Sequence, residues 1–269
     1  MSFLLGYFCA LLVGVTLGLL GGGGAILAIP VMVYLMSIQE MDATGYSLFI
    51  VGMTSLVGAW QYVHEHQRQR NKIFRTAFVF APASILMGIL TRYLVKNYLP
   101  NELYQIGSFH LEKGLLIMLI LGIVLMVVSK NMIAPKDIEQ EEICHFSIKK
   151  IAFRGGCVGL LAGLVCSGGG FLITPVLVKY LRFPMRLAIG TSLVIICLNS
   201  WFMFIGDLVI RKSLHLPWTF LLSFSGISVI GVFIGNYLSH HISSAKLKPV
   251  FGYFVLILGA FILTKELIF

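Results

Sequence analysis

The sequence predicts an all-α protein that crosses a membrane several times and is built from two homologous halves. Three observations support this fold class: an apolar composition, eight hydrophobic segments, and a glycine-rich motif that occurs twice. Hydrophobic residues make up 58% of the 269 residues and charged residues only 12%, with a mean hydropathy of +0.93. A soluble domain carries about a quarter charged residues, so this composition indicates a membrane protein.

The hydrophobic segments set the order of the predicted helices. Most exceed the roughly 20 residues that a helix needs to cross about 30 Å of hydrocarbon. The segments lie at approximately 3–36, 43–63, 76–91, 114–129, 155–178, 187–206, 213–239 and 249–264. The net charge of +9 comes from basic residues in the short loops beside them, which reports membrane topology rather than a nucleic-acid partner.

The glycine-rich motif indicates an internal duplication. Gly-Leu-Leu-Gly-Gly-Gly-Gly-Ala-Ile-Leu-Ala-Ile-Pro at 18–30 returns as Gly-Leu-Val-Cys-Ser-Gly-Gly-Gly-Phe-Leu-Ile-Thr-Pro at 163–175, a separation of 145 residues. Without a gap, the same separation still aligns Ser55 with Ser200. Chance does not keep register over that distance, so the two halves descend from one repeated unit.

The two copies divide the chain into three parts. Residues 1–130 are the predicted N-terminal membrane repeat, and residues 151–269 are the C-terminal one. Residues 131–150 between them carry charges of both signs and few apolar side chains. Such a stretch buries too little apolar surface to fold by itself, so we predict a charged cytoplasmic linker.

The first segment of each half is predicted to be broken at its glycine-rich turn. A continuous helix over 3–36 would be about 50 Å long, and each glycine in a helix interior costs about 1 kcal/mol relative to alanine. Two arrangements remain open: one bent span, or a hairpin of two partial helices. Three uninterrupted helices follow the broken segment in each half.

Loop charges favour repeats of inverted orientation. Residues 37–42 contain two acids and no base, whereas the equivalent residues 182–187 contain two arginines. Cytoplasmic loops carry an excess of Lys and Arg, so equivalent loops of opposite charge are expected on opposite sides of the membrane. Parallel repeats, each with four complete spans, are the alternative.

The two breaks are the predicted binding site for a small anion. A helix that restarts after Gly24 directs the free amides of Gly24 to Leu27 toward the break, and the second copy does so from Gly169 to Leu172. Helix N-termini bind anions through such amides, and freed backbone within a bilayer is tolerated where it is buried or lines a cavity. The alternative is that the glycines only allow close helix packing.

Polar residues in the next segment complete the predicted site. Ser47 and Ser192 occupy equivalent positions, and Thr54 aligns with Asn199. Their hydroxyl and amide groups need partners in lipid, although a hydroxyl can also bond back to its own helix. The predicted substrate-binding residues are Gly22, Gly23, Gly24, Ala25, Ser47, Thr54, Ser167, Gly168, Gly169, Gly170, Ser192 and Asn199.

No catalytic, metal-binding or cofactor-binding residues are predicted. The five cysteines form no CxxC pair, and the seven histidines lie at segment ends or in loops. Asp207, the most embedded acid, is expected to stand alone near a segment end. An integral-membrane enzyme or assembly factor would need clustered acid–base groups, so it is the weaker alternative. An anion channel is the other alternative.

The twin motifs resemble the sulfite exporter TauE/SafE family of membrane anion permeases. The resemblance rests on GxxGGGGxxLxxP and GxxxSGGGxxxxP, each followed by Ala-x-Gly-x-Ser-Leu, and it covers both halves. It implies a permease of the inner or plasma membrane for sulfite, an organosulfonate or a related sulfur-containing anion. Its implied partners are that small anion and the lipid bilayer. Tyr46 stands where the second copy has Thr191, so the hydroxyl contribution of the first half is in doubt.

The sequence also favours transport that does not require a coupled proton. Proton-coupled carriers place a carboxylate or histidine within their spans, and none lies near the breaks in the sequence. Export of an anion from a negative interior is downhill by about 2.3 kcal/mol per charge at 100 mV. Sodium held by carbonyls near Leu20 and Val165 is the alternative left open.

Overall fold

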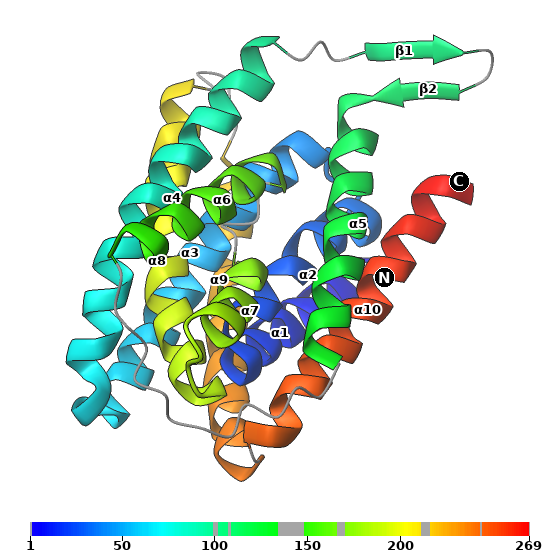
Figure 1. Ribbon diagram of the computed structural model, residues 1–269. Helices are drawn as coiled ribbons and strands as arrows, with labels where there is room; N and C mark the ends of the chain where they lie inside the picture. Colours follow the sequence, from blue (N-terminus) through cyan, green and yellow to red (C-terminus); the bar gives the residue numbers. More distant parts are fainter. Residues whose placement is uncertain are drawn as a thin grey trace.

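The computed structural model describes residues 2–98, 102–106, 109–133, 148–165, 170–210, 216–242 and 244–268, which are almost entirely helical (Figure 1). The helices of the first half are α1 (Ser2–Leu20), α2 (Ala25–Pro30), α3 (Glu40–Glu65), α4 (Arg70–Tyr98) and α5 (Lys113–Ile133). Those of the second half are α6 (Ile148–Val165), α7 (Gly170–Tyr180), α8 (Met185–Ile210), α9 (Trp218–His241) and α10 (Ser244–Ile268). Most of the predicted linker, residues 131–150, lies outside the described residues.

Four of the described helices are long and apolar enough to cross a membrane: α3, α4, α8 and α9. Shorter apolar stretches lie in α1, α5 and α10. In the most apolar part of α3 and of α8, 78% of the residues are buried inside the protein, against 39% for α4 and α9. The first pair therefore forms the centre of the fold, and the second pair turns an apolar face outward.

The sequence repeat is visible in the backbone. The first residues of α3 and α8 lie 145 positions apart, and so do their last residues. Left-handed backbone recurs at the same spacing, at Ser37 with φ 54° and Arg182 with φ 53°. A positive φ is uncommon for residues other than glycine. Its recurrence means that both copies turn into their central helix through the same local geometry.

The central helices α3 and α8 run antiparallel. Near the start of α3, the Phe49 ring lies 5.5 Å from the Phe204 ring near the end of α8. Near the end of α3, the Tyr62 hydroxyl donates a 2.6 Å hydrogen bond to the Arg186 carbonyl at the start of α8. Gly52, between these two contacts on α3, packs against Trp201. As the residue number increases along α3, the residue number of the contacting residue on α8 decreases, so the two helices run in opposite directions.

The outer helices pair across the two halves. α1 packs against α9, where the Ser228 hydroxyl donates to the Ala10 carbonyl at 2.9 Å and a side chain at Gly14 would collide with the Ser228 backbone. α4 packs against α6, where a side chain at Gly159 would collide with the Ser84 backbone. Small residues allow such close approach of helices in membranes. Exchanging the halves converts one pair into the other, because the repeat relates α1 to α6 and α4 to α9.

The first hydrophobic segment folds back on itself as a hairpin. A Cβ on Gly24 would lie 2.6 Å from the Leu17 Cα, and one on Gly6 would lie 3.1 Å from the Met36 side chain. The reversal occurs at a 3-10 turn over Gly21–Gly24, where Gly21 has φ 69°. Of the two arrangements left open by the sequence, the structure contains the hairpin. In the second copy, α6 and α7 contact each other, and the four residues between them lie outside the described part.

A small β-hairpin departs from the all-helical prediction. β1 (Glu102–Ile106) pairs antiparallel with β2 (Phe109–Glu112), with Ile106 opposite Phe109. It extends from the start of α5, which lies beside α10 along one edge of the molecule (Figure 1). Tyr104, Ile106 and Phe109 are residue types that favour strands, and they lie between two hydrophobic segments rather than within one. The β-hairpin lies outside the helical core.

Candidate functional site

The two glycine-rich breaks touch each other through their backbones. A side chain on Gly22, in the first break, would collide with the carbonyl group of Gly170, the first residue of α7. Conversely, a Cβ on Gly170 would lie 3.0 Å from the Gly22 carbonyl oxygen and 2.9 Å from the Ile196 side chain on α8. Only glycine permits so close a contact. Two positions that are 148 residues apart in the chain therefore meet beside α8.

Two hydroxyl groups lie at this meeting point. A Cβ on Gly21 would lie 2.7 Å from the Ser192 Oγ, so the Ser192 side chain stands directly over the turn. Ser192 accepts a 3.0 Å hydrogen bond from Thr174 on α7 and donates one of 2.8 Å to the Ile189 carbonyl. Both hydroxyl side chains are fully buried. Hydroxyls reorient easily, so this pair can donate to a bound oxyanion as well as to each other.

Sequence reasoning missed Gly21 and Thr174. Gly21 could have been found from the predicted reversal of the chain. A sharp turn needs left-handed backbone, which glycine adopts without strain. Thr174 is a polar residue four positions after Gly170 and therefore on the same side of the helix. Its partner Ser192 lies on the next helix, which the sequence did not connect to it.

The first restarted helix differs in detail from the prediction. α2 does begin at Ala25, but Gly21–Gly24 already coil as a 3-10 turn instead of an open break. A 3-10 turn uses its amides in its own i to i+3 hydrogen bonds. The amides from Gly24 onward therefore follow a helical turn that begins at Gly21, rather than an open break. Gly24 itself packs on α1, as expected if the glycines allow close helix packing.

The predicted residues on α3 hold their hydroxyl hydrogens within their own helix. Ser47 donates to the Thr44 carbonyl at 2.8 Å, and Thr54 donates to the Ile50 carbonyl at 2.8 Å. Both side chains are fully buried. This is the back-bonding that competes with ligand binding for Ser and Thr in helices. Ser167, Gly168 and Gly169 lie outside the described residues.

Asn199 lies one helical turn beyond Ile196, whose side chain reaches Gly170. Its Nδ2 donates a 2.8 Å hydrogen bond to the Ser84 Oγ on α4, and its Oδ1 is buried with no partner among the described residues. A buried amide oxygen without a donor is costly. Asn199 is therefore equipped to accept a hydrogen bond or a cation through Oδ1, in addition to any contact through its second N–H.

Asp207 does not stand alone, contrary to the expectation from the sequence. Its carboxylate oxygen lies 2.8 Å from the Arg92 guanidinium on α4, and both side chains are buried. The two residues are 115 positions apart and each lies near a segment end, so no local pattern links them. A buried carboxylate needs such a partner, because an isolated buried charge is far too costly.

A second polar contact joins the equivalent pair of helices, α9 and α3, through residues that are not equivalent in the repeat. Asn236 on α9 donates to the Glu65 carboxylate at the end of α3, with a distance of 3.2 Å to Oε2. Glu65 and Asp207 each lie near the C-terminal end of a central helix. Because these helices are antiparallel, the two contacts fasten outer helices to opposite ends of the core. Among the described residues, no group of His, Cys, Asp and Glu side chains could hold a metal ion.

Comparison with known proteins places these features in a family. The family model described as sulfite exporter TauE/SafE matches residues 6–262. A probable membrane transporter protein of Xylella fastidiosa (strain Temecula1) is 29% identical over 262 residues, covering 95% of this chain and 92% of the relative. The probable membrane transporter protein YunE of Bacillus subtilis is 25% identical over 244 residues, 83% of each chain. No solved structure matches.

Proposed function

The chain belongs to the sulfite exporter TauE/SafE family, and from this premise we propose that it carries a small sulfur-containing oxyanion, sulfite or an organosulfonate, across the cytoplasmic membrane. The family is one of multi-pass membrane transporters rather than enzymes, and its curated relatives are described as probable membrane transporters.

The proposed membrane arrangement is a pair of inverted repeats, residues 1–130 and 151–269, joined by the cytoplasmic linker 131–150. Each repeat contributes a re-entrant hairpin followed by three crossings, which accounts for the eight hydrophobic segments. The antiparallel packing of α3 and α8 supports this, since repeats related by an axis in the membrane plane set matched helices antiparallel. Repeats related by an axis along the membrane normal would set them parallel.

The basic loops support the same arrangement. The Lys72 ammonium, in the loop-proximal turn of α4, lies 5.0 Å from the centre of the Phe183 ring before α8. The Arg154 guanidinium near the start of α6 lies 4.7 Å from the centre of the Tyr180 ring. Basic residues at the starts of α4 and α6 thus lie beside the loop before α8, which itself carries Arg182. The positive-inside rule assigns that end to the cytoplasm.

The proposed substrate site is the contact between the breaks, and the packing of Gly22 against Gly170 is the observation that carries it. Around that contact lie the buried backbone of the first turn and of the start of α7, and the hydroxyls of Thr174 and Ser192. Such a site suits an oxyanion without a buried Lys or Arg, because helix starts supply donors and a partial positive charge. The site proposed from sequence is kept, with Gly21 and Thr174 added.

Transport by the purified protein tests the proposal. Proteoliposomes loaded with sulfite, a short alkyl sulfonate, phosphate or chloride would be compared with protein-free liposomes. We expect saturable flux of at least one sulfur oxyanion and little flux of chloride. Flux that does not saturate would indicate a channel. If no sulfur oxyanion crosses faster than in protein-free liposomes, the proposed substrate class is wrong.

A further inference from the structure

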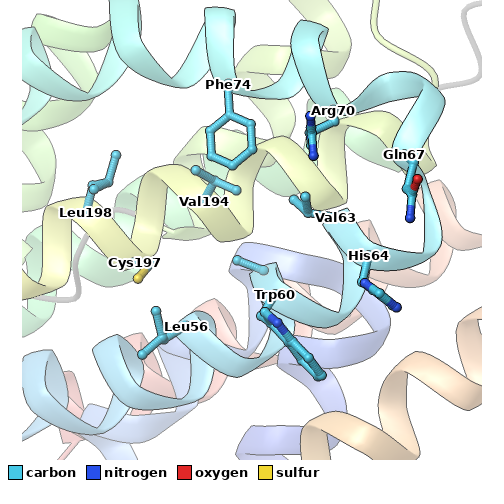
Figure 2. A pocket seen from close by; sticks show the side chains of 11 residues that line it. Leu56, Trp60, Val63, His64, Gln67, Arg70, Phe74, Val194, Cys197 and Leu198 are labelled. Atoms are coloured by element: carbon cyan, nitrogen blue, oxygen red, sulfur yellow. The ribbon is translucent and has the colours of Figure 1, made fainter.

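A pocket of about 400 Å³ lies beside α3, away from the two breaks (Figure 2). It is lined by the second half of α3, the loop and first turns of α4, and the middle of α8. Its size falls in the range of small-molecule pockets, roughly 300–1,000 Å³. The lining residues come from a different part of the α8 surface than Ser192 and Ile196, which face the breaks.

The lining is amphipathic, with its polar groups at one end. His64, Gln67 and Arg70 lie together at one end of the view, and Leu56, Cys197 and Leu198 lie at the other (Figure 2). Trp60 and Phe74 line the space between these ends. A ligand that fills this pocket must therefore combine a polar or anionic group with an apolar body.

The apolar side of the pocket is open to the outside of the helix bundle. Trp60 is 66% exposed and Leu56 48% exposed, although both lie on the central helix α3. Under the proposed topology, this outer surface is in contact with lipid acyl chains. Trp60 lies near the end of its helix, at the depth where tryptophan is enriched at membrane interfaces. The opening therefore faces lipid rather than a water-filled path.

The polar end lies in the most basic part of the first half. Arg68, Arg70, Lys72 and Arg75 fall within eight residues, and the sequence from His66 to Asn101 contains no acidic residue. The preceding acid, Glu65, accepts hydrogen bonds from Asn236. Basic pockets between membrane helices on the cytoplasmic side bind the headgroups of anionic lipids. The charge of the pocket mouth thus complements an anionic headgroup.

We propose that this pocket binds an anionic glycerophospholipid, with its phosphate at Arg70 and Gln67 and one acyl chain along Trp60, Leu56 and Leu198. The proposal rests on the topology given under Proposed function, but not on the identity of the transported anion. A small hydrophilic oxyanion would meet apolar walls over most of this pocket, so the lipid accounts for the whole lining. The bound lipid would join the start of α4 to the central pair α3 and α8.

Fluorescence quenching by brominated lipids provides the test. The chain has three tryptophans, so a Trp201→Phe/Trp218→Phe background leaves Trp60 as the single reporter. This protein would be reconstituted in phosphatidylcholine vesicles that contain a minor fraction of brominated phosphatidylglycerol or, in parallel, brominated phosphatidylcholine. We expect the brominated phosphatidylglycerol to quench Trp60 more strongly at equal content, because it concentrates in the pocket.

Two loop variants make the test specific. Arg70→Gln should lower the apparent preference for phosphatidylglycerol about fivefold, which corresponds to about 1 kcal/mol for one basic residue near an anionic headgroup. Arg68→Gln changes the same charge in the same loop but does not line this pocket, so it should keep most of the preference. Both arginines are exposed, so neither variant removes a core contact.

Three outcomes would overturn the proposal. Equal quenching by the two brominated lipids would show that no anionic lipid is selected. An equal loss in Arg68→Gln and Arg70→Gln would show a diffuse surface effect rather than a pocket. Abolition of the preference by excess sulfite would assign the pocket to the transported anion. The readout needs no substrate, so its failure leaves the transport proposal intact.

Discussion

The guanidinium of Arg92 lies 2.8 Å from the carboxylate of Asp207, with side-chain exposures of 6% and 4%. This ion pair connects α4 to the end of α8, and the contact of Asn236 with Glu65 connects α9 to the end of α3. The two contacts join equivalent helix pairs, although the repeat aligns Arg92 with Tyr237 and Asp207 with Tyr62. Each end of the central pair is therefore fastened to an outer helix by an acidic residue.

Arg92→Met is expected to destabilise the protein by roughly 3–5 kcal/mol, because it leaves the buried Asp207 carboxylate without its cation. The double variant Arg92→Met/Asp207→Leu should recover most of the loss, since apolar replacements of similar volume often match a buried pair. Unfolding of the detergent-purified protein measures both effects. The exposed Arg68→Met is the control and should unfold like the wild type. A double variant no more stable than the single one would contradict this account.

Thr174→Val and Ser192→Ala test the hydroxyls at the contact of the breaks. If they bind the anion, each change should raise the KM for the transported anion about tenfold or more, because a hydrogen bond to a charged group contributes roughly 1.5–3 kcal/mol. Initial flux into proteoliposomes over a range of anion concentrations gives KM. Thr264→Val on α10 is the matched control, because its exposed hydroxyl bonds only to its own helix in the structure. Wild-type KM in both site variants would remove the hydroxyls from the site.

Gly24→Val is expected to disrupt the first hairpin. Its Cβ would lie 2.6 Å from the Leu17 Cα, and overpacking of this kind costs typically 1–3 kcal/mol or more. The melting temperature in detergent should fall, together with transport. Gly226→Val on α9 is the control, since no atom lies within 4 Å of the added Cβ. Equal melting temperatures for the two variants would mean that the 3-10 turn at Gly21–Gly24 does not pack on α1 in solution.

The inverted arrangement predicts opposite accessibility at two equivalent positions. Ser37 should be extracytoplasmic and Arg182 cytoplasmic, and both are exposed. Phe183, in the same loop, is buried beneath Lys72 and would label poorly. Cysteines introduced at Ser37 and Arg182, in a background without the five native cysteines, would be probed with an impermeant thiol reagent on intact cells. Labelling of both positions from one side would exclude inverted repeats.

The sequence was sufficient to predict the features that repeat along the chain. The spacing of 145 residues relates α3 to α8 at both ends, because the same apolar pattern and the same loop length occur twice. The glycine runs marked where the first segment turns, since four successive glycines disfavour a continuous helix. The apolar pattern, the loop length and the glycine runs can each be read from a short stretch of the chain, without knowing which helices meet.

Contacts between distant helices could not be predicted in the same way. Thr174 and Ser192 lie on neighbouring helices, and Arg92 and Asp207 on helices from different halves; apolar helix surfaces do not specify which polar residues will meet. The packing of Gly24 on α1 could not be predicted for the same reason, because its neighbour Leu17 is known only once the hairpin is known. Asn199 was singled out as costly to bury, but its partner Ser84 was not foreseen.

The membrane potential is expected to drive anion export. The atoms nearest to Gly21, Gly22 and Gly170 belong to Ile189, Ser192, Ile196 and the backbone, and these groups do not exchange protons near neutral pH. Moving one negative charge out of a cell whose interior is 100 mV negative releases about 2.3 kcal/mol of free energy. Anion export should therefore be electrogenic and need no proton. In sealed proteoliposomes, flux should follow an imposed potassium-diffusion potential and reverse with its sign. Flux that ignores this potential but tracks a pH gradient would refute the mechanism. Flux that appears only with sodium would instead assign a coupling role to acceptor groups such as the unpartnered Asn199 Oδ1.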